Sequence, residues 1–568
     1  MIGIDVGSDA VRICVGDRCS QKPLIRNIND TEHTMSTEHL WVQITQLLGE
    51  LGVREPEMAA TGREGEGIGA SEGTGFSEGI EFPEFGPLRD PNSVMVAATC
   101  SMAVVERTVS PHGPIFTPLE DIIVWMDGRA VSQAHWVSQR LCPATLAQIG
   151  GAVTPEMGIA KLKWVDEKYK NSGKDVVVFE LYDWVSYLFA AGGVGSGGEV
   201  KCLGREKVVF EEGSRAMDGS VKGWGRDVME ALEISVSVGH LGGSEESVTV
   251  SRFPYAGEPI AQNKFLGGTV LHGCIDCYAG IVAQNRPAST PPSQSLGRLE
   301  MAAKSKEASS GNQHSGSTLD MVAGTSTCFI GSIPSSTSPI PGLWGPFNQL
   351  MPTPVYAFGQ PATGKLFAEL LEETGETFES LEAAASTAEE DANESLVVLS
   401  KNHMYYGDRH GNRSPYGDFN MDEVRLAGSN ADKGAKFAIK NNHTLQYYLL
   451  IEFLVFQTKQ LVDRLGPLDV VRVSGSQARN KRFMRLLSEF AFYGKRKPEV
   501  YVAGGNATYS GASAGSTIAS GKKSDTKDKV FETKPLSDTE KKVLQTKYDF
   551  FLELSSWQNR FRQAMKGI

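Results

Sequence analysis

One uncommon element occurs twice in this chain: a short apolar strand that enters a glycine turn and returns as a second strand. The first copy reads MIGIDVGSDAVRI over residues 1–13, and the second reads LDMVAGTSTCFI over residues 319–330. Such a turn can arrange backbone N–H groups, a hydroxyl and a carboxylate around a phosphate. Either copy alone would be typical of an ordinary hairpin. Two copies in one chain predict a nucleotide held between two related halves.

The overall composition argues against a nucleic-acid or membrane partner. The 568 residues allow two large domains, and the net charge of −12 is spread without a long acidic or basic run. The most apolar segment, Tyr447 to Phe456, is too short to span a bilayer and contains Glu452. Because the chain enters a strand at once, we expect no signal peptide.

The cysteines predict a reduced, cytoplasmic protein. All 8 lie at scattered positions rather than at the spacings of a disulfide framework. Cys274 and Cys277 form a solitary Cys-x-x-Cys pair, without a second pair or a histidine at ligand spacing. We therefore expect neither a zinc site nor redox chemistry there.

Low-complexity segments divide the chain into two halves. Residues 58–79 are rich in glycine and glutamate and are expected to be an insertion, while residues 284–316 lack any hydrophobic period. We expect an N-terminal domain over residues 1–283, a connection over 284–318 and a C-terminal domain over 319–568. The first half alternates strands and helices, as α/β domains do.

The end of the second half also follows an α/β pattern. A long amphipathic helix is predicted over residues 444–465, a strand over 468–473, and a helix made largely of Gly, Ala and Ser over 509–520. Small side chains allow close approach to a neighbour, which could equally be a sheet or a nucleotide. A terminal helical stretch over residues 538–565 is expected to cover the core.

A glycine-rich segment at residues 359–366 has the spacing of a P-loop, Gly-x4-Gly-Lys. It lacks the hydroxyl that would bind magnesium, since Leu366 occupies that position. The preceding residues 353–358 are interrupted by Pro354, which is unusual in a buried strand. We interpret the segment as a turn that opens a helix over residues 363–374.

Asp276 is the strongest candidate for a general base. It follows a strand-like run, and small residues that open a helix come after it. A carboxylate there would lie in a cleft beside helix N–H groups, where it could take the proton from a hydroxyl that attacks a phosphate. The alternative, that Asp276 only caps the helix, stays open at this point.

Several motifs, taken in order, are similar to those of one enzyme family. Asp276 and the four residues after it resemble the Asp-x-His-Ala-Gly segment of the FGGY carbohydrate kinases, in which the aspartate is the catalytic base. The resemblance covers nearly the whole chain and is strongest to the pentulose branch, the D-ribulokinase-like proteins. The other matching segments are DVGS at 5–8, WMDGRA at 125–130, MDGSVKGW at 217–224, AGTST at 323–327, FGQPATG at 358–364, GDRHGNRSP at 407–415, and GSQ at 475–477 with Asn480.

This resemblance implies an α/β fold with two ribonuclease-H-like domains, as in actin-like ATPases, flanking a deep cleft. It implies ATP on the second domain and sugar on the first, with Asp276 as the base and Asp5 holding hydrated Mg²⁺. The phosphate- and ATP-binding positions that carry over are Gly7, Ser8, Arg12, Gly324, Thr325, Ser326, Gly475, Ser476 and Asn480. The sugar-binding positions that carry over are Asp127, Arg129 and Lys222.

Some positions depart from the family pattern. Tyr278 replaces the histidine of the base motif, Ser476 replaces a glycine, and Ala357 replaces a glutamate that contacts sugar in the pentulose branch. Ser8 and Asp9 stand where Thr-Gly is usual, and Asp9 adds a negative charge that could hold a metal or repel phosphate. The base and the metal-holding aspartate are retained, but the sugar specificity is left open.

We therefore expect an ATP-dependent kinase that phosphorylates the terminal hydroxyl of a ketopentose, with D-ribulose at O5 as the first choice. One alternative is a kinase for another ketose or polyol, such as L-ribulose or xylulose. Another is a catalytically weak sugar- or nucleotide-binding protein. A chaperone-type ATPase is disfavoured by Asp276 and by the lack of a peptide-binding domain. The expected partners are the sugar and ATP, and a homodimer stays open.

Overall fold

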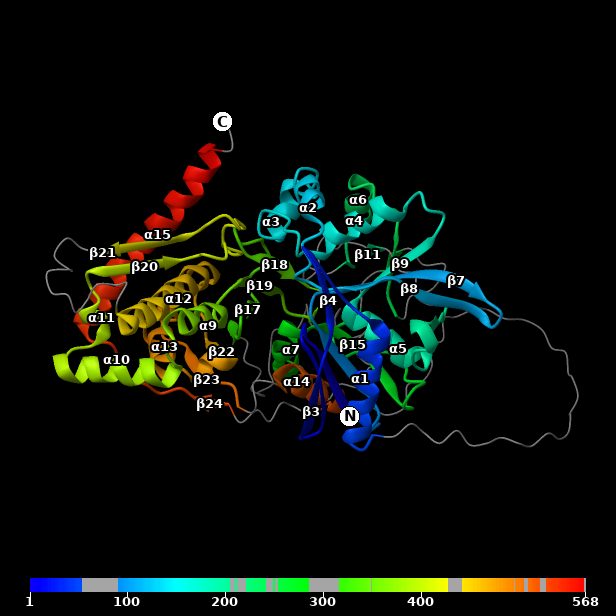
Figure 1. Ribbon diagram of the computed structural model, residues 1–568, viewed down its shortest axis with the longest axis horizontal. Helices are drawn as coiled ribbons and strands as arrows, with labels where there is room; N and C mark the ends of the chain where they lie inside the picture. Colours follow the sequence, from blue (N-terminus) through cyan, green and yellow to red (C-terminus); the bar gives the residue numbers. More distant parts are fainter. Residues whose placement is uncertain are drawn as a thin grey trace, which may run out of the picture.

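The computed structural model describes most of the chain. It covers residues 1–53, 90–204, 210–211, 221–241, 249–250, 254–285, 316–348, 350–427, 442–494, 496–504, 509–521 and 528–565. The predicted insertion at 58–79 and nearly all of the predicted connection at 284–316 lie outside these residues. The first half of the chain, blue to green, forms one body of mixed sheet and helix, and the second half, mainly yellow to red, forms another beside it (Figure 1).

Two central sheets, one in each half, share the same strand order. Each has three antiparallel strands followed by two parallel ones, so that β3-β2-β1-β6-β15 corresponds to β19-β17-β16-β22-β23. This repeated order is the ribonuclease-H-like topology and confirms the predicted fold class.

The strands of the first central sheet are β1 (Ile2–Val6), β2 (Ala10–Val15), β3 (Arg18–Pro23), β6 (Val94–Ala98), β15 (Thr269–Ile275) and the edge strand β14 (Pro259–Gln262). Those of the second are β16 (Thr318–Ala323), β17 (Thr327–Ser332), β19 (Val355–Gln360), β22 (Val470–Ser474), β23 (Glu499–Val502) and the edge strands β18 (Trp344–Phe347) and β24 (Lys529–Val530).

The first half contains a further mixed sheet and seven helices among its described residues. The strands of that sheet are β4 (Arg26–Asn29), β5 (Glu32–Met35), β7 (Met102–Ser110), β8 (Gly113–Ile123), β9 (Asp175–Glu180), β10 (Val200–Lys201) and β12 (Ser237–Gly239), and β11 (Phe210–Glu211) pairs separately with β13 (Thr249–Val250). The helices are α1 (Thr37–Glu50), α2 (Val131–Ser138), α3 (Pro143–Gln148), α4 (Gly158–Tyr169), α5 (Leu181–Ala191), α6 (Arg226–Ala231) and α7 (Ala279–Asn285).

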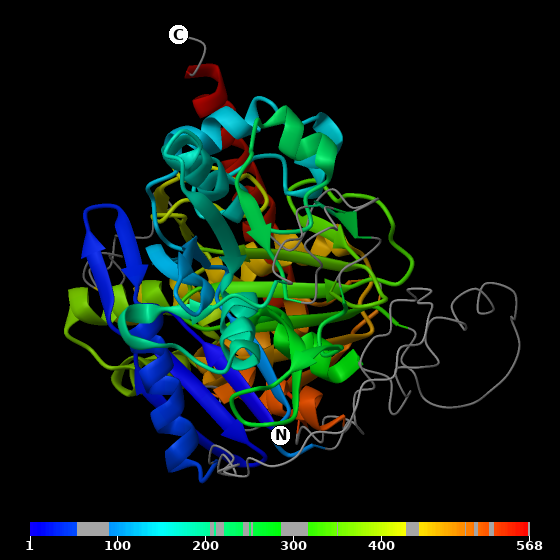
Figure 2. The same ribbon diagram turned by 90° about the vertical axis from the view of Figure 1, so that its right-hand side faces the viewer.

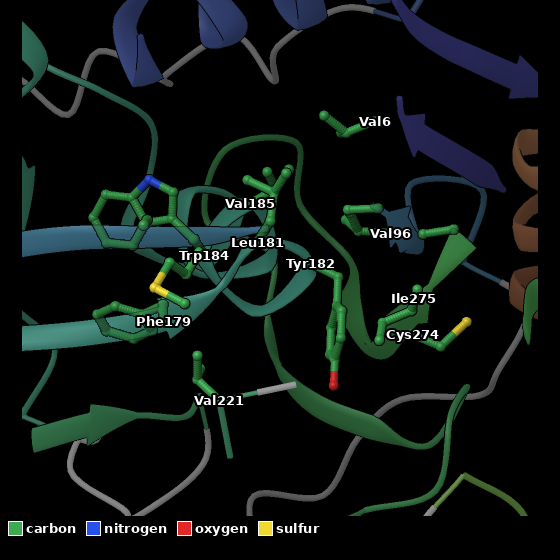
Figure 3. Close-up of a cluster of buried hydrophobic side chains, with 14 of the residues drawn as sticks. Val6, Val96, Phe179, Leu181, Tyr182, Trp184, Val185, Val221, Cys274 and Ile275 are labelled. Atoms are coloured by element: carbon green, nitrogen blue, oxygen red, sulfur yellow. The ribbon is translucent and has the colours of Figure 1, made fainter. Parts of the chain in front are cut away.

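Helix α5 joins the two sheets of the first half into one core. All its residues from Leu181 to Ala190 are buried, as expected for a helix that is apolar on nearly every face. It contacts β6 and β15 on one side and β7 and β9 on the other. Figure 3 shows its side chains between Phe179 of β9 and the ends of the central strands at Val6, Val96 and Ile275. This packing holds in place the strand ends from which the candidate site is built.

The second half is organised around one long buried helix, α12 (His443–Leu465). It contacts α9, α10, α13, α15 and β20. The other elements of this half are α9 (Gly364–Thr374), α10 (Phe378–Ala392), α11 (Leu396–Leu399), α13 (Lys481–Leu486), α14 (Ser510–Ser520), α15 (Asp538–Met565) and the hairpin β20 (His403–Gly407) with β21 (Glu423–Ala427). The helices predicted at 444–465, 509–520 and 538–565 are confirmed to within one residue.

The P-loop-like segment is a strand followed by a helix, and one reason given against it was wrong. Residues 355–360 form the fully buried strand β19 in spite of Pro354, because the proline precedes the strand and leaves its ladder intact. The predicted turn and helix are confirmed, since α9 begins at Gly364.

Helix α14 belongs to the second half in sequence but packs on the first central sheet. It lies against β1, β6 and α7. A Cβ atom on Gly3 of β1 would lie 1.9 Å from the backbone oxygen of Ala512, and Gly515 of α14 lies against Gly3 in turn. Of the two alternatives for this small-residue helix, close packing on a sheet is therefore confirmed. In Figure 2 it lies low in the molecule, beneath the strands of the first half.

The expectation that all cysteines are reduced is wrong for one pair. Cys14 on β2 and Cys19 on β3 face each other across the hairpin, and a disulfide joins them. The hairpin sets their Cα atoms 4.2 Å apart, which is the reason that two residues only five positions apart can be bonded. Among the described helices, none has both the length and the apolar character needed to cross a membrane.

Candidate active site

The first glycine turn, between β1 and β2, carries a charged pair. Asp5 and Arg12 are partners in the strand register, and the Arg12 guanidinium lies 3.6 Å from the Asp5 carboxylate. The turn closes with Gly7 N–H donating to the backbone oxygen of Ala10 at 3.0 Å. Trp125 donates its indole N–H to the Ser8 hydroxyl at 2.9 Å, so a residue of the WMDGRA segment fixes this turn from outside.

Asp9 has a cationic partner of its own. Its carboxylate lies 2.7 Å from the guanidinium of Arg26, although 76% of its side chain is exposed. The additional negative charge beside the first turn is therefore balanced within the protein. Asp9 was expected either to hold a metal or to repel phosphate, and this pairing argues against simple repulsion.

Asp276 and Asp5 lie near the ends of two strands of the first central sheet, and the charge of Asp276 acts on Asp5. Asp276 follows β15, Asp5 lies on β1, and β6 separates the two strands. Asp276 accepts a hydrogen bond of 2.7 Å from the N–H of Cys277 and is the first residue of a short 3-10 turn, whose N-cap position is Ile275.

Both carboxyl groups have raised pKa values. Burial, followed by the nearby charge of Asp276, raises the pKa of Asp5 to about 7, while Arg12 opposes the shift. Burial raises the pKa of Asp276 as well, against the hydrogen bond from Cys277 and the charge of Arg12. Asp5 is buried and Asp276 is half-buried, and Arg12 is a cation that acts on both carboxyl groups. Oxygen ligands of this kind suit Mg²⁺, so the residues present fit the ion that the resemblance implies.

The second glycine turn, between β16 and β17, contains no charged residue. Gly324 donates to the backbone oxygen of Ser326 at 2.9 Å, which closes the turn. The start of α9 is anchored on it, because Thr363 donates to Thr325 at 2.8 Å and Gly364 donates to Gly324 at 2.9 Å. The P-loop-like segment thus supports the second turn.

The predicted adenosine-binding segment follows β22, next to the second turn. Gly475 has φ of +92°, and a Cβ atom there would lie 2.2 Å from the backbone oxygen of Ala323. Ser476 begins a 3-10 turn. The Asn480 side chain caps α13 by accepting from Phe483 N–H at 3.0 Å and donates to the Tyr447 hydroxyl at 2.9 Å. Both ends of the Asn480 amide are therefore engaged within the protein.

Asp127 and Arg129 bind each other. Arg129 donates to both Asp127 oxygens at 2.8 Å, and Asp127 also accepts from the backbone N–H of His33 at 2.6 Å. Burial would raise the pKa of Asp127, but the hydrogen bonds from Arg129 and His33 outweigh it and lower the pKa. The pair fastens the loop after β8 to the β4–β5 hairpin, which is a structural role.

Lys222 lies in a buried polar cluster that sequence reasoning missed. Its ammonium group donates to Asp183, to His272 at 2.9 Å and to His240 at 3.3 Å, and only 1% of the residue is exposed. Burial, followed by the positive charge of Lys222, lowers the pKa of both histidines. One ligand atom from each of Asp183, His240 and His272 lies within 4.8 Å of the others, as in a metal site, but the ammonium group already supplies the cation.

A second missed feature connects the two halves near the first turn. Arg413 of the GNRSP segment lies 3.1 Å from the carboxylate of Glu156 in the first half, and its guanidinium lies 5.6 Å from the ring centre of Trp125. Trp125 in turn holds Ser8. The most branch-specific motif of the second half is thereby connected, through Trp125, to the first glycine turn.

Two of the departures from the family pattern are buried. Tyr278 is 1% exposed and Ala357 is 5% exposed. Ala357 lies on β19 opposite Ile330 of β17, and it packs in the same apolar cluster as the core of the first half. At this position the chain thus has the methyl group of Ala357, where the pentulose branch has a carboxylate.

Comparisons with known proteins agree with this geometry. Residues 319–493 match the C-terminal domain of the FGGY family of carbohydrate kinases. The chain is 30% identical to Protein MPA43 of Saccharomyces cerevisiae over 69% of this chain and 67% of that protein, and 27% identical to D-ribulokinase YDR109C of the same yeast over 86% and 68%.

Solved structures show the same fold at low identity. A xylulose kinase from Brucella ovis superposes with a TM-score of 0.64 at 12% identity over 99% of both chains. A gluconate kinase from Lactobacillus acidophilus superposes with a TM-score of 0.63 at 11% identity over 98% of both chains. The repeated sheet topology, the paired glycine turns and the relatives in sequence lead to one conclusion: the chain belongs to the FGGY family of carbohydrate kinases.

Proposed function

We propose that this protein transfers the terminal phosphate of ATP to the O5 hydroxyl of D-ribulose, with Asp276 as the general base. The observation that carries the proposal is the pairing of two carboxyl groups, the half-buried Asp276 and the buried Asp5, near a glycine turn. A base with a raised pKa is better matched to the removal of a proton from a sugar hydroxyl. The 27% identity to a D-ribulokinase supports the choice of acceptor.

Different residues of the chain would have different roles in phosphoryl transfer. Asp276 accepts the proton at its carboxylate as the sugar oxygen attacks. Asp5 would hold Mg²⁺, which supplies charge neutralisation on the phosphates. Arg12 and the turn at Gly7 and Ser8 lie next to these carboxyl groups and would face the transferred phosphate.

The second half would bind the rest of the nucleotide. Gly324, Thr325 and Ser326 form a tight uncharged turn that suits the outer phosphates, and Gly475, Ser476 and Asn480 follow at the end of the adjacent strand for the adenosine. With no charged side chain in this turn, backbone dipoles and shape would provide the contacts. We expect ATP and the sugar to meet between the halves, where closure excludes water.

A second candidate, a kinase for another ketose or polyol, is favoured by two observations. Lys222 is held by Asp183, His240 and His272, so its ammonium group is not turned toward an outside ligand. Ala357 offers no polar atom to a sugar. The sugar contacts of this chain would then differ from those of the pentulose branch, or be weaker.

An assay of ADP release with Mg-ATP tests the proposal directly. Ketopentoses, pentitols and hexuloses would be supplied one at a time, with hydrolysis in the absence of sugar as the control. Strong stimulation by D-ribulose alone is the expected result. Stimulation by a different sugar would keep the mechanism and replace the substrate, whereas no stimulation by any acceptor would leave a sugar- or nucleotide-binding protein. A cytoplasmic location stays a prediction.

A further inference from the structure

Helix α15 has two apolar faces, and the described residues cover only one of them. Its inner face packs on the second half through Leu544, Tyr548 and Phe551, which are all buried. Further along, Arg562 forms an ion pair of 3.1 Å with Asp418, so the inner face stays attached almost to the end of the helix. The sequence predicted that this helix covers the core, and that prediction accounts for one face only.

The outer face of α15 carries a row of large exposed side chains. Phe550, Trp557, Phe561 and Met565 are 54%, 55%, 52% and 48% exposed, and Leu554, which also packs against the core of the second half, lies partly exposed between the first two. The Trp557 and Phe561 rings stack on each other with centroids 5.6 Å apart. Figure 1 shows this part of the helix, in red, extending beyond the body of the second half. An exposed apolar row on a protruding helix is typical of an interaction surface.

The spacing of this row is that of a helix-pairing seam. Phe550, Leu554, Trp557 and Phe561 follow one another at intervals of four, three and four residues, as core positions of a coiled coil do. The row is also nearly symmetric about its centre, because its spacing is the same in both directions and a phenylalanine lies at each end. If two copies of the helix lie antiparallel, Phe550 meets Phe561 of the partner subunit and Leu554 meets Trp557 of the partner subunit.

The charges beside the seam are complementary in the same arrangement. Glu553 and Arg560 each precede a seam residue and lie on the same side of it, and both are exposed. Neither forms an ion pair with any other described residue. Antiparallel pairing brings Glu553 next to Arg560 of the partner subunit, and the two-fold axis repeats the contact.

We propose that the outer face of α15 binds a second copy of this chain, forming an antiparallel helix pair across a two-fold axis. The occupant is another copy because both the apolar row and the flanking charges are complementary to themselves. The surface is small compared with the roughly 800 Å² per partner of a standard interface, so the dimer is reversible and depends on concentration. The proposal does not rest on the identity of the substrate.

Sedimentation of the full chain over a range of concentrations tests this proposal. The natural chain should shift from monomer to dimer with increasing concentration, and W557E combined with F561E should remain monomeric. Gln563→Glu, an exposed change on α15 away from the seam, is the matched control and should dimerise normally. A natural chain that is monomeric throughout, or a dimer that survives the double substitution, would overturn the proposal.

Charge reversal tests the orientation independently of the apolar contacts. Glu553→Arg alone should weaken dimerisation by about tenfold, because it faces Arg560 of the partner subunit, and adding R560E should restore it. Failure of the second change to restore the dimer would overturn the antiparallel arrangement. A monomeric chain that instead sediments with phospholipid vesicles would show that a membrane surface occupies this face, and would equally overturn the proposal. All variants should retain the circular dichroism spectrum of the natural chain.

Discussion

The two glycine turns have the same topology but opposite electrostatic character. The first turn is surrounded by charged side chains, with Asp5 facing Arg12, Asp9 facing Arg26, and Asp276 close by. None of the residues of the second turn, Gly324 to Ser326, is charged, and the turn is held by backbone hydrogen bonds from its own residues and from the start of α9. A duplicated fold has therefore been used in two ways. Under the proposed function, one half would carry out the chemistry on the phosphate and the other would bind the rest of the nucleotide.

Each half also contains a buried aspartate on the strand that precedes its glycine turn, and we expect the two aspartates to differ in function. Burial raises the pKa of Asp320 on β16 to about 7, as it does that of Asp5 on β1. Asp320 is opposed by Arg472 at 3.8 Å and lies against Gly280 of α7, away from the second turn. The comparison can therefore be tested by changing matched residues in the two halves.

The largest expected effect is the loss of the base. Asp276→Asn should lower kcat by about 10²–10⁴-fold, since general-base catalysis contributes that much to proton transfer. ATP binding should be unchanged, as measured by calorimetry. Asp320→Asn is the matched control in the second half and should leave kcat within a few-fold of the natural value. Equal losses in both variants would contradict the assignment of chemistry to the first half.

The next effect is a pH dependence of stability that originates at Asp5. Its folded pKa of about 7 exceeds the ordinary value of 3.8, so the folded state holds a proton that the unfolded state releases. The free energy of unfolding should therefore fall as pH rises from about 4 to 7, by roughly 2–4 kcal/mol for this group. Asp5→Asn should flatten the fall, making the variant more stable than the natural chain at pH 8 in urea without metal. A variant with the same pH profile as the natural chain would refute the shift.

A steric test compares the first turn with Gly475, which lies beside the second turn. Gly475→Ala should destabilise the protein by about 2 kcal/mol or more, because φ is +92° and the new methyl group would meet the Ala323 backbone. Gly466→Ala is the control: its φ is +87°, but nothing lies within 4 Å of its Cβ position. At the first turn, the new methyl group of Gly7→Ala would lie 2.9 Å from the end of the flexible Arg12 side chain and 3.2 Å from the backbone oxygen of Ala10, and this change should cost less. Thermal unfolding measures all three.

The smallest expected effect concerns Asp9. Asp9→Asn removes an exposed ion pair with Arg26 and should change the free energy of unfolding by less than about 1 kcal/mol. The change should decrease further in high salt, because exposed pairs are screened. A large loss of kinase activity in this variant would show that Asp9 acts on the phosphate or the metal ion instead of only balancing Arg26.

The glycine turns and most helices were predictable, because local patterns specify them. Asp5 and Asp276 stand next to strand ends that their own sequence marks, and α15 follows a clear helical period. The Lys222 cluster was not predictable, because Asp183, His240 and His272 lie 39, 18 and 50 residues from Lys222 and share no spacing. The same is true of Arg413 and Glu156, which lie 257 residues apart. The Cys14–Cys19 pair had a usable signal, since a hairpin places such residues opposite each other.

The position of α14 has a consequence for how the protein is made. The first central sheet emerges from the ribosome early, but the helix that packs against Gly3 is encoded beyond residue 509. Until that helix arrives, one side of β1 and β6 lacks its native cover, although both strands are already synthesised. For nearly the whole of translation, this apolar surface of the first half is therefore exposed to aggregation unless a chaperone binds it. The part of the enzyme that is synthesised first is thus completed among the last.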